Sequence, residues 1–202
     1  MIRLLLATKN RGKVQELKAL LGLGALKNVE VKAIFEMPHI KEPEENGKTF
    51  SDNARIKALH YAAAHRLMCI ADDSGIVVDA LGGRPGVHSA RYAGPQASDR
   101  DNNAMLLDDL KACPGPWKAA FVCVAVCVLP GRVIAETDGR IDGEIIPAPR
   151  GTGGFGYDPV FLVKGTGRTM AELSTEEKNR ISHRGQAIRK LVAELRAQGV
   201  LG

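Results

Sequence analysis

Aromatic residues are scarce in this sequence, making up 4% of its 202 residues. Proteins that bind single-stranded nucleic acids stack the bases on aromatic side chains, so the scarcity argues against a platform of that kind. A dense block of lysine and arginine is also missing. The net charge of +5 therefore favours a small polyanion such as a nucleotide, and a basic nucleic-acid-binding module is the alternative.

The sequence has no apolar run as long as a membrane span, which needs about 20 residues. Asn10, Arg11 and Lys13 interrupt the first apolar run, and no small-residue cleavage site follows it, so we expect no signal peptide. The four cysteines lack close metal-ligand spacing, and Cys123 and Cys127 are expected to be buried, reduced thiols in a strand. Together these features predict a cytoplasmic protein.

The remaining composition, 45% hydrophobic and 25% charged, suits a single globular domain or two closely joined lobes. Apolar runs that predict strands alternate with amphipathic stretches that predict helices, which indicates an α/β fold with a mixed sheet. The expected strands are residues 2–7, 29–35, 67–71, 119–129, 132–137 and 159–163. The expected helices are residues 12–21, a segment that begins at a capping box of Thr49 with Asp52 and ends near residue 65, residues 99–110 after a cap at Ser98, and a C-terminal segment that begins at a capping box of Ser174 with Glu177.

The first polar turn, "TKNRGK" (Thr8–Lys13), lies between an expected strand and an expected helix. It differs from a Walker A loop, because position 7 is alanine and the residue after Lys13 is Val14 rather than serine or threonine. Backbone amides at a helix N-terminus with three nearby cations still favour an anion. A solvated basic turn is the alternative interpretation of this segment.

Two acidic pairs are candidates for metal binding. "ADDSG" sets Asp72 and Asp73 at the expected end of a buried strand, where alternation directs them to opposite faces. A carboxylate there is able to bind a divalent cation that bridges phosphate oxygens, or to cap a turn. Glu44 and Glu45 offer a second ligand, or are simply solvated.

Two further segments contain candidate binding residues. "GTGGFG" (151–156) matches a dinucleotide fingerprint formally, but a strand rather than a helix is expected after it. Its glycines, beside Phe155 and Tyr157, suggest instead a close approach to a flat ring. "EEKNRISHRGQ" (176–186) places Lys178, His183 and Arg184 around an expected helix junction, either as phosphate and base ligands or as a basic surface.

Taken together, the chain resembles the inosine/xanthosine triphosphate pyrophosphatase family nearly from end to end. The resemblance rests on five ordered blocks: "LATKNRGKVQEL", "EENGKTFSDNARIKA", "IADDSGIVVDALGGRPGVHSARYAG", "PRGTGGFGYDPVF" and "AELSTEEKNRISHRGQA". It implies a long mixed sheet flanked by helices, with two lobes of a single domain around a deep cleft. It also implies a homodimer that uses Mg²⁺ to hydrolyse ITP, dITP and XTP to the monophosphate and pyrophosphate.

The resemblance also assigns roles to residues. Asp73 is the expected catalytic carboxylate and metal ligand, with Glu44 chosen over its neighbour Glu45 as the second ligand. The expected substrate-binding residues are Thr8, Lys9, Asn10, Arg11, Gly12, Lys13, Ser74, Phe155, Gly156, Tyr157, Asp158, Lys178, His183 and Arg184. The base is expected to be recognised through its 6-keto group, because donors placed for an oxygen would be left unpaired by the amino group of adenine.

One position departs from the family pattern, since His88 precedes "SARY" where an aromatic residue is frequent. The related Maf-type nucleotide pyrophosphatases, which prefer other bases, are the alternative within enzymes. The "FGYDP" and "SHR" segments argue against that alternative.

Overall fold

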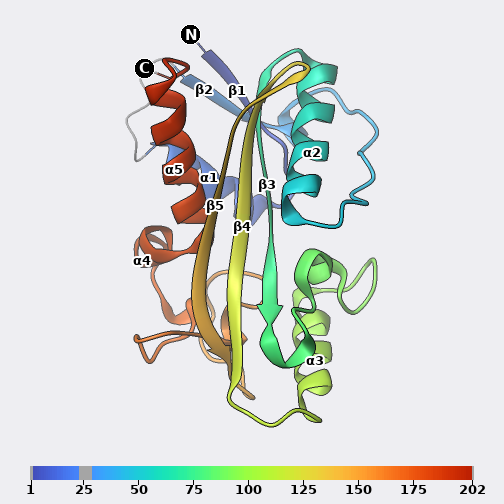
Figure 1. Ribbon diagram of the computed structural model, residues 1–202, viewed down its shortest axis with the longest axis vertical. Coiled ribbons are helices and arrows are strands. Elements are labelled where there is room, and N and C mark those ends of the chain that lie inside the picture. Colours follow the sequence, from blue (N-terminus) through green and yellow to red (C-terminus); the bar gives the residue numbers. More distant parts are fainter. Residues whose placement is uncertain (1, 23–28, 202) are drawn as a thin grey trace. The chain divides into compact units, whose positions relative to one another are not determined.

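The computed structural model describes residues 2–22 and 29–201. Within these residues, six strands form one mixed sheet in the order β2-β1-β3-β4-β5-β6 (Figure 1). β1 runs parallel to β2 and β3, whereas β5 and β6 are antiparallel. The strands are β1 (Ile2–Leu6), β2 (Val29–Ala33), β3 (Met68–Val78), β4 (Trp117–Leu129), β5 (Arg132–Ile145) and β6 (Phe161–Val163). The α-helices are α1 (Arg11–Gly22), α2 (Phe50–His65), α3 (Asp99–Leu110), α4 (Thr175–Ile181) and α5 (His183–Ala197). The expected α/β class with a mixed sheet is confirmed.

The described residues divide into two compact units, each built from separate stretches of the sequence. The first unit lies within Met1–Asp73, Cys123–Gly139 and Arg184–Gly202. The second comprises Ser74–Val122 and Arg140–His183. Among the described residues, no helix is long and apolar enough to cross a membrane.

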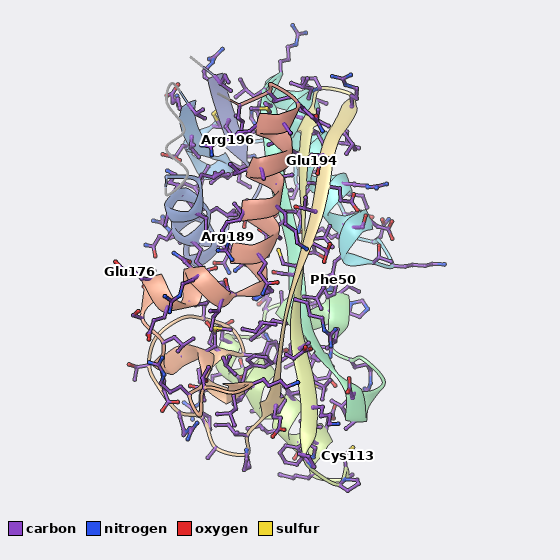
Figure 2. The ribbon with its side chains drawn as sticks, turned by 60° about the vertical axis from the view of Figure 1, so that its left-hand side comes forward. Phe50, Cys113, Glu176, Arg189, Glu194 and Arg196 are labelled. Carbon is purple, nitrogen blue, oxygen red and sulfur yellow. The ribbon has the colours of Figure 1, made fainter. Side chains whose placement is uncertain are left out.

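The first unit has a layer of helices on each face of its strands (Figure 1). One hydrophobic cluster joins α1 and α5 to β1, β3 and β4, with Leu17 and Leu191 fully buried. A second cluster packs α2 against the opposite face through Ala54 and Ala58. Figure 2 shows the polar side of α5, where Arg189 and Arg196 are exposed. This amphipathic pattern is the reason that the helices cover the sheet as the sequence predicts.

Helix α2 begins where the sequence predicts it. The Thr49 side chain accepts a hydrogen bond from the Asp52 amide at 3.1 Å, and the Asp52 carboxylate accepts one from the Thr49 amide at 3.0 Å. This reciprocal capping box satisfies amides that have no partner within the helix. The same device starts α3 at Ser98 and α4 at Ser174, as expected.

The second unit has its own core, centred on Phe121 of β4 and Phe161 of β6. Their ring centroids lie 4.5 Å apart, and α3 contributes Leu106 and Leu110 to the same cluster. Gly143 of β5 passes so close to β6 that an added Cβ would lie 2.3 Å from the Leu162 carbonyl oxygen. This close packing positions the loop that connects β5 and β6.

The main differences from the sequence expectations concern three strands. β3 continues through Ser74 and Gly75 to Val78, so the prediction that Asp72 and Asp73 end a strand is wrong. The β-branched run 76–78 favours extended structure, and the small residues before it do not force a turn. β5 runs on to Ile145, beyond the expected end at 137. β2 stops at Ala33, because the Glu36 carboxylate turns back to accept from the Ala33 amide at 2.6 Å.

Candidate functional site

The turn before α1 is organised as a helix N-terminus. The Asn10 side chain accepts from the Lys13 amide at 3.0 Å, and Thr8 Oγ1 accepts from the Asn10 amide at 3.2 Å. Amides in the first turn of a helix have no acceptor within the helix and carry partial positive charge. The local structure therefore suits an anion, as the sequence predicts.

The cations of this turn have different surroundings. Lys9 is exposed and forms an ion pair with Glu42. The Arg11 guanidinium lies 5.4 Å from the ring centroid of Phe35. The Lys13 ammonium points inward, where it lies 3.1 Å from Asp72 Oδ2. Lys13 thus connects the turn to the carboxylates of β3.

Asp72 is the centre of a buried ionic network in the first unit. Its Oδ2 is 3.1 Å from Lys13 Nζ and also accepts from Arg184 Nε at 3.1 Å. Arg184 further pairs with Glu16 of α1, and the arginine is 1% exposed. Burial by itself would raise the pKa of Asp72, but Lys13 and Arg184 reverse this and hold the pKa well below its usual value. Asp72 therefore stays ionised.

Asp73 points to the opposite face of β3, and its pKa is shifted in the opposite direction, upward. Lys57 of α2 donates to Asp73 Oδ1 at 3.0 Å and to Glu45 Oε2 at 2.9 Å. Burial raises the pKa of Asp73, and Lys57 offsets this only in part. Two adjacent carboxylates whose pKa values are pushed in opposite directions are a frequent feature of acid–base sites.

Asp73 is also contacted by the start of α2. Asn53, which is 1% exposed, donates to Asp73 Oδ2 at 3.4 Å and accepts from the Gly47 amide at 2.8 Å. A Cβ on Gly47 would lie 2.5 Å from the Asp52 Cβ and 2.7 Å from Asn53 Oδ1. The close approach of this glycine therefore brings the acidic loop to α2.

The residues around Asp73 fit a divalent cation. Among the described residues, no group of three or more His, Cys, Asp or Glu side chains is arranged to hold a metal ion. Asp73 and Glu45 nevertheless share one cation, the Lys57 ammonium. Mg²⁺ at nucleotide sites is held by one or two carboxylates, with phosphate oxygens and water completing its shell. Glu45 contacts the same lysine as Asp73, whereas Glu44 is exposed.

In the second unit, the glycine-rich segment folds into a tight turn around Asp158. The Asp158 Oδ2 accepts from the Phe155 amide at 2.9 Å and from Lys178 Nζ at 2.6 Å. Gly154 has φ +73°, and a Cβ there would lie 2.0 Å from the same oxygen. Only glycine fits this position, so Gly154 permits the close packing of the turn around Asp158.

Lys178 and His183 also lie in the second unit. Lys178 is 6% exposed, and its ammonium lies 4.4 Å from the ring centroid of Phe155. The His183 ring is buried and stacks on Phe121, with centroids 4.9 Å apart. Ser74 follows Asp73 along β3 and is partly buried. The predicted site residues thus form two groups. The first group, in the first unit, is Thr8–Lys13, Asp73 and Arg184. The second group, in the second unit, is Ser74, Phe155, Gly156, Tyr157, Asp158, Lys178 and His183, and Glu44 belongs to neither group.

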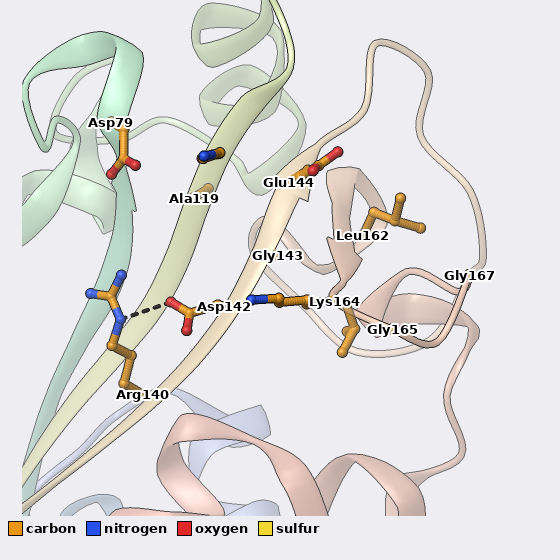
Figure 3. A pocket seen from close by; sticks show the side chains of 12 residues that line it. Asp79, Ala119, Arg140, Asp142, Gly143, Glu144, Leu162, Lys164, Gly165 and Gly167 are labelled. Atoms are coloured by element: carbon orange, nitrogen blue, oxygen red, sulfur yellow. Dashed lines mark hydrogen bonds and ion pairs between the residues drawn. The ribbon is translucent and has the colours of Figure 1, made fainter.

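A cavity of about 340 Å³ lies elsewhere in the second unit, on β4, β5 and β6 (Figure 3). None of the predicted site residues lines it. Three cations (Lys118, Arg140, Lys164) and three acids (Asp79, Asp142, Glu144) line it. Arg140 donates to Asp142 at 2.8 Å, the contact dashed in Figure 3. With its charges balanced, this cavity is a poor match for a triphosphate.

Three residues that were not predicted from the sequence contact members of the first group: Lys57 and Asn53 bind Asp73, and Glu16 binds Arg184. Asn53 and Lys57 stand four residues apart, the spacing that puts two side chains on one face of a helix. That signal was available in "SDNARIKA". The pairing of Glu16 with Arg184, 168 positions away, had no sequence signal.

The profile of the Ham1 family matches residues 4–194 of the chain. A dITP/XTP pyrophosphatase from Geobacillus kaustophilus is 52% identical over 95% of this chain and 93% of its own length. One from Geobacter sulfurreducens is 48% identical over 99% of this chain and 100% of its own length.

Two solved structures are similar to this chain over nearly its whole length. A HAM1 protein from Coxiella burnetii superposes with a TM-score of 0.87 at 39% identity, covering 98% of this chain and 100% of its own. A nucleoside-triphosphatase / dITP/XTP pyrophosphatase from Mycobacterium abscessus gives a TM-score of 0.75 at 42% identity, covering 94% and 97%.

Proposed function

Because the chain belongs to the Ham1 family, we propose that it is a hydrolase that converts dITP, ITP and XTP to the nucleoside monophosphate and pyrophosphate. The observation that carries this proposal within the molecule is the pair Asp72 and Asp73 on β3. One carboxylate stays ionised beside the lysine of the α1 turn, and the other has a raised pKa beside a second lysine.

The reaction adds water across the bond between the α- and β-phosphates. Asp73 accepts a proton from the attacking water, the water oxygen bonds to the α-phosphorus, and the bond to the bridging oxygen breaks so that pyrophosphate leaves. A base with a pKa raised toward the working pH transfers this proton more effectively than an ordinary aspartate. Lys57 orients Asp73 through its contact with Oδ1.

The α1 turn binds the triphosphate. Its helix amides and the side chains of Lys9, Arg11 and Lys13 neutralise phosphate charge, including the charge that builds up during displacement. Asp73 and Glu45 are the residues that would hold Mg²⁺. When bound there, the ion would supply Lewis-acid stabilisation of the phosphate oxygens. Arg184 supports the phosphate site from within, by holding Asp72 and thereby Lys13.

The second group of residues binds the base. Phe155 offers an aromatic face, Lys178 lies over the same ring, and Tyr157 follows in the same turn. His183 stacks on Phe121 in the core of the same unit. Recognition of the 6-keto oxygen separates hypoxanthine and xanthine from adenine, because adenine presents a donor where the site expects an acceptor. We expect ATP to be hydrolysed much more slowly than ITP.

The experiment is a nucleotide panel in water labelled with heavy oxygen, with Mg²⁺ present. dITP, ITP and XTP should release pyrophosphate, and the label should appear in the monophosphate because the attack is at the α-phosphorus. ATP and GTP are the matched controls for the base. Release of orthophosphate would indicate a phosphatase, label in pyrophosphate would indicate attack at the β-phosphorus, and equal rates for all bases would contradict the assigned specificity.

The family resemblance extends the proposal to a cytoplasmic homodimer that depends on Mg²⁺. Sedimentation equilibrium should give twice the mass of the chain, and a chelator should stop pyrophosphate release. A monomer with full activity would remove the dimer from the proposal without affecting the chemistry.

A further inference from the structure

Two side chains of helix α3 bind the backbone amide and the backbone carbonyl of one glycine in the glycine-rich turn. Asp99, the first residue of α3, accepts a hydrogen bond from the Gly156 amide at 2.7 Å. Asn103, one helical turn further on, donates to the Gly156 carbonyl oxygen at 2.9 Å. The spacing of four places both side chains on the same face of the helix. Both polar groups of Gly156 are thus bonded to α3.

This pair of contacts is separate from the internal bonds of the turn. Asp158 accepts hydrogen bonds from the Phe155 amide within the turn and from Lys178 of α4, and the second bond also attaches the turn to α4. The two bonds from α3 to Gly156 give the turn a further attachment within the second unit. Gly156 adjoins Phe155 on one side and Tyr157 on the other, and the Tyr157 hydroxyl donates to the Ser89 carbonyl at 2.9 Å.

α3 itself is firmly placed. Its N-terminus is fixed by the Ser98 capping box, and Leu106 and Leu110 are fully buried in the core of the second unit. Asn102 of the same helix accepts from the Ala93 amide at 2.9 Å. A rigid element that holds a loop by two directed hydrogen bonds fixes the side chain next to them.

We propose that Asp99 and Asn103 are positioning residues for the base: by clamping Gly156 they hold the ring of Phe155 where it stacks on hypoxanthine or xanthine. This inference deepens the proposed function and rests on it. Asp99 and Asn103 belong to the second unit, with the residues proposed to bind the base, whereas the carboxylates proposed for the chemistry belong to the first. The clamp therefore acts on base binding. Binding energy of this uniform kind changes KM and leaves kcat nearly unaltered.

The test compares Asp99→Ala and Asn103→Ala with the wild-type enzyme on dITP and ATP. Each variant should raise KM for dITP roughly fivefold or more, the size expected for one lost hydrogen bond, and change kcat less than about twofold. The preference for dITP over ATP in kcat/KM should narrow as well. Asp99→Asn, whose Oδ1 still accepts from the Gly156 amide, should recover most of the lost affinity. Asp108→Ala is the matched control, because Asp108 is on α3 but pairs with Lys111 at 2.8 Å.

A second measurement needs no nucleotide. Amide hydrogen exchange of residues 155–157 should quicken in Asp99→Ala and Asn103→Ala, while exchange in the core of the second unit stays as in the wild type. Unchanged exchange at these residues would overturn the clamp. Faster exchange with unchanged KM and base preference would overturn its role in base binding. A wild-type protein that hydrolyses none of the nucleotides would overturn the proposed function alone, since exchange still tests the clamp.

Discussion

At the scale of single residues, Asp72 and Asp73 show how neighbours in a sequence acquire different chemistry. Both are almost completely buried, which disfavours the charged form of either carboxylate. Asp72 lies on the face of β3 where Lys13 and Arg184 converge, whereas Asp73 lies on the face of Lys57 and Glu45. The alternation of a strand therefore separates a structural anion from a candidate base.

The Asp73→Asn variant should fold normally and lose at least about 100-fold in kcat, since a positioned base typically contributes that much. Its KM for dITP should change little, because the phosphate turn and the base site remain. Steady-state kinetics together with circular dichroism check both statements. Asp108→Asn, the same change at an exposed position, is the control; wild-type kcat in Asp73→Asn would remove Asp73 from the mechanism.

Asp72→Asn should instead destabilise the protein, because it leaves Arg184 and Lys13 without their shared anion. Removing one partner of a buried ion pair costs about 3–5 kcal/mol. The depressed pKa of Asp72 means that this stabilisation is present above the ordinary value of 3.8 and is lost as the pH falls through the lower folded-state pKa. The free energies of unfolding of wild type and variant, measured with urea, should therefore differ most at neutral pH and converge in strong acid. A constant difference at every pH would contradict the assignment.

The two acidic neighbours Glu44 and Glu45 allow the metal ligand to be identified by a matched pair of variants. Glu45→Gln should raise the Mg²⁺ concentration needed for half-maximal activity about tenfold or more, as for a lost or perturbed metal contact. Glu44→Gln should leave it unchanged, because Glu44 is exposed. Magnesium titrations after chelator treatment give both values. The reverse order would restore Glu44 as the ligand.

At the scale of elements, α2 and the end of the loop before it are joined by hydrogen bonds from residues 47–49 to Asp52 and Asn53. The capping box at Thr49 fixes the start of the helix, and Gly47 allows the loop to lie against Asp52 and Asn53. As a result Asn53 and Lys57 both reach Asp73, and Lys57 also reaches Glu45. The helix therefore carries the groups that orient the candidate base.

Gly47→Ala should disturb this junction of the loop with α2, because the added Cβ would overlap atoms that have little freedom to move. We expect a loss of about 1–3 kcal/mol of unfolding free energy, typical of overpacking, and a weaker response to Mg²⁺ as Glu45 shifts. Thermal unfolding and the magnesium titration measure the two effects. Gly22→Ala is the control, because a Cβ there meets nothing within 4 Å. Equal behaviour of the two variants would contradict the close approach.

At the scale of the whole molecule, the net charge of +5 gives the protein a field that attracts polyanions. Ion pairs in the first unit cancel much of the charge close to them. The attraction of a distant polyanion therefore depends on the net charge of the whole protein. Such attraction is screened by salt.

Raising the ionic strength from low to high should therefore lower kcat/KM for dITP, while kcat at saturating nucleotide changes less. The reason is that steering acts on the encounter and the buried carboxylates are screened weakly. Initial rates over a range of KCl concentrations at fixed Mg²⁺ measure both quantities. A kcat/KM that does not depend on salt would show that the global charge has no part in substrate capture.

Sequence patterns alone predict the α/β class and the helix starts, and they indicate the segments that hold the candidate site residues. These depend on local rules: apolar periodicity, capping boxes at Thr49, Ser98 and Ser174, and residue types in short blocks. The continuation of β3 through Ser74 and Gly75 was missed, because propensity is weak against pairing with neighbouring strands.

The tertiary structure determines which side chains meet. Glu16 pairs with Arg184 and Asp158 with Lys178, over separations of 168 and 20 residues. It also placed Glu45 rather than Glu44 at Lys57, and set Asp99 and Asn103 against Gly156. Burial and distant charges control the pKa of a carboxylate, and both arise only when separate stretches of chain pack together. The two aspartates are identical in the sequence, and folding alone makes one a fixed anion and the other a candidate base.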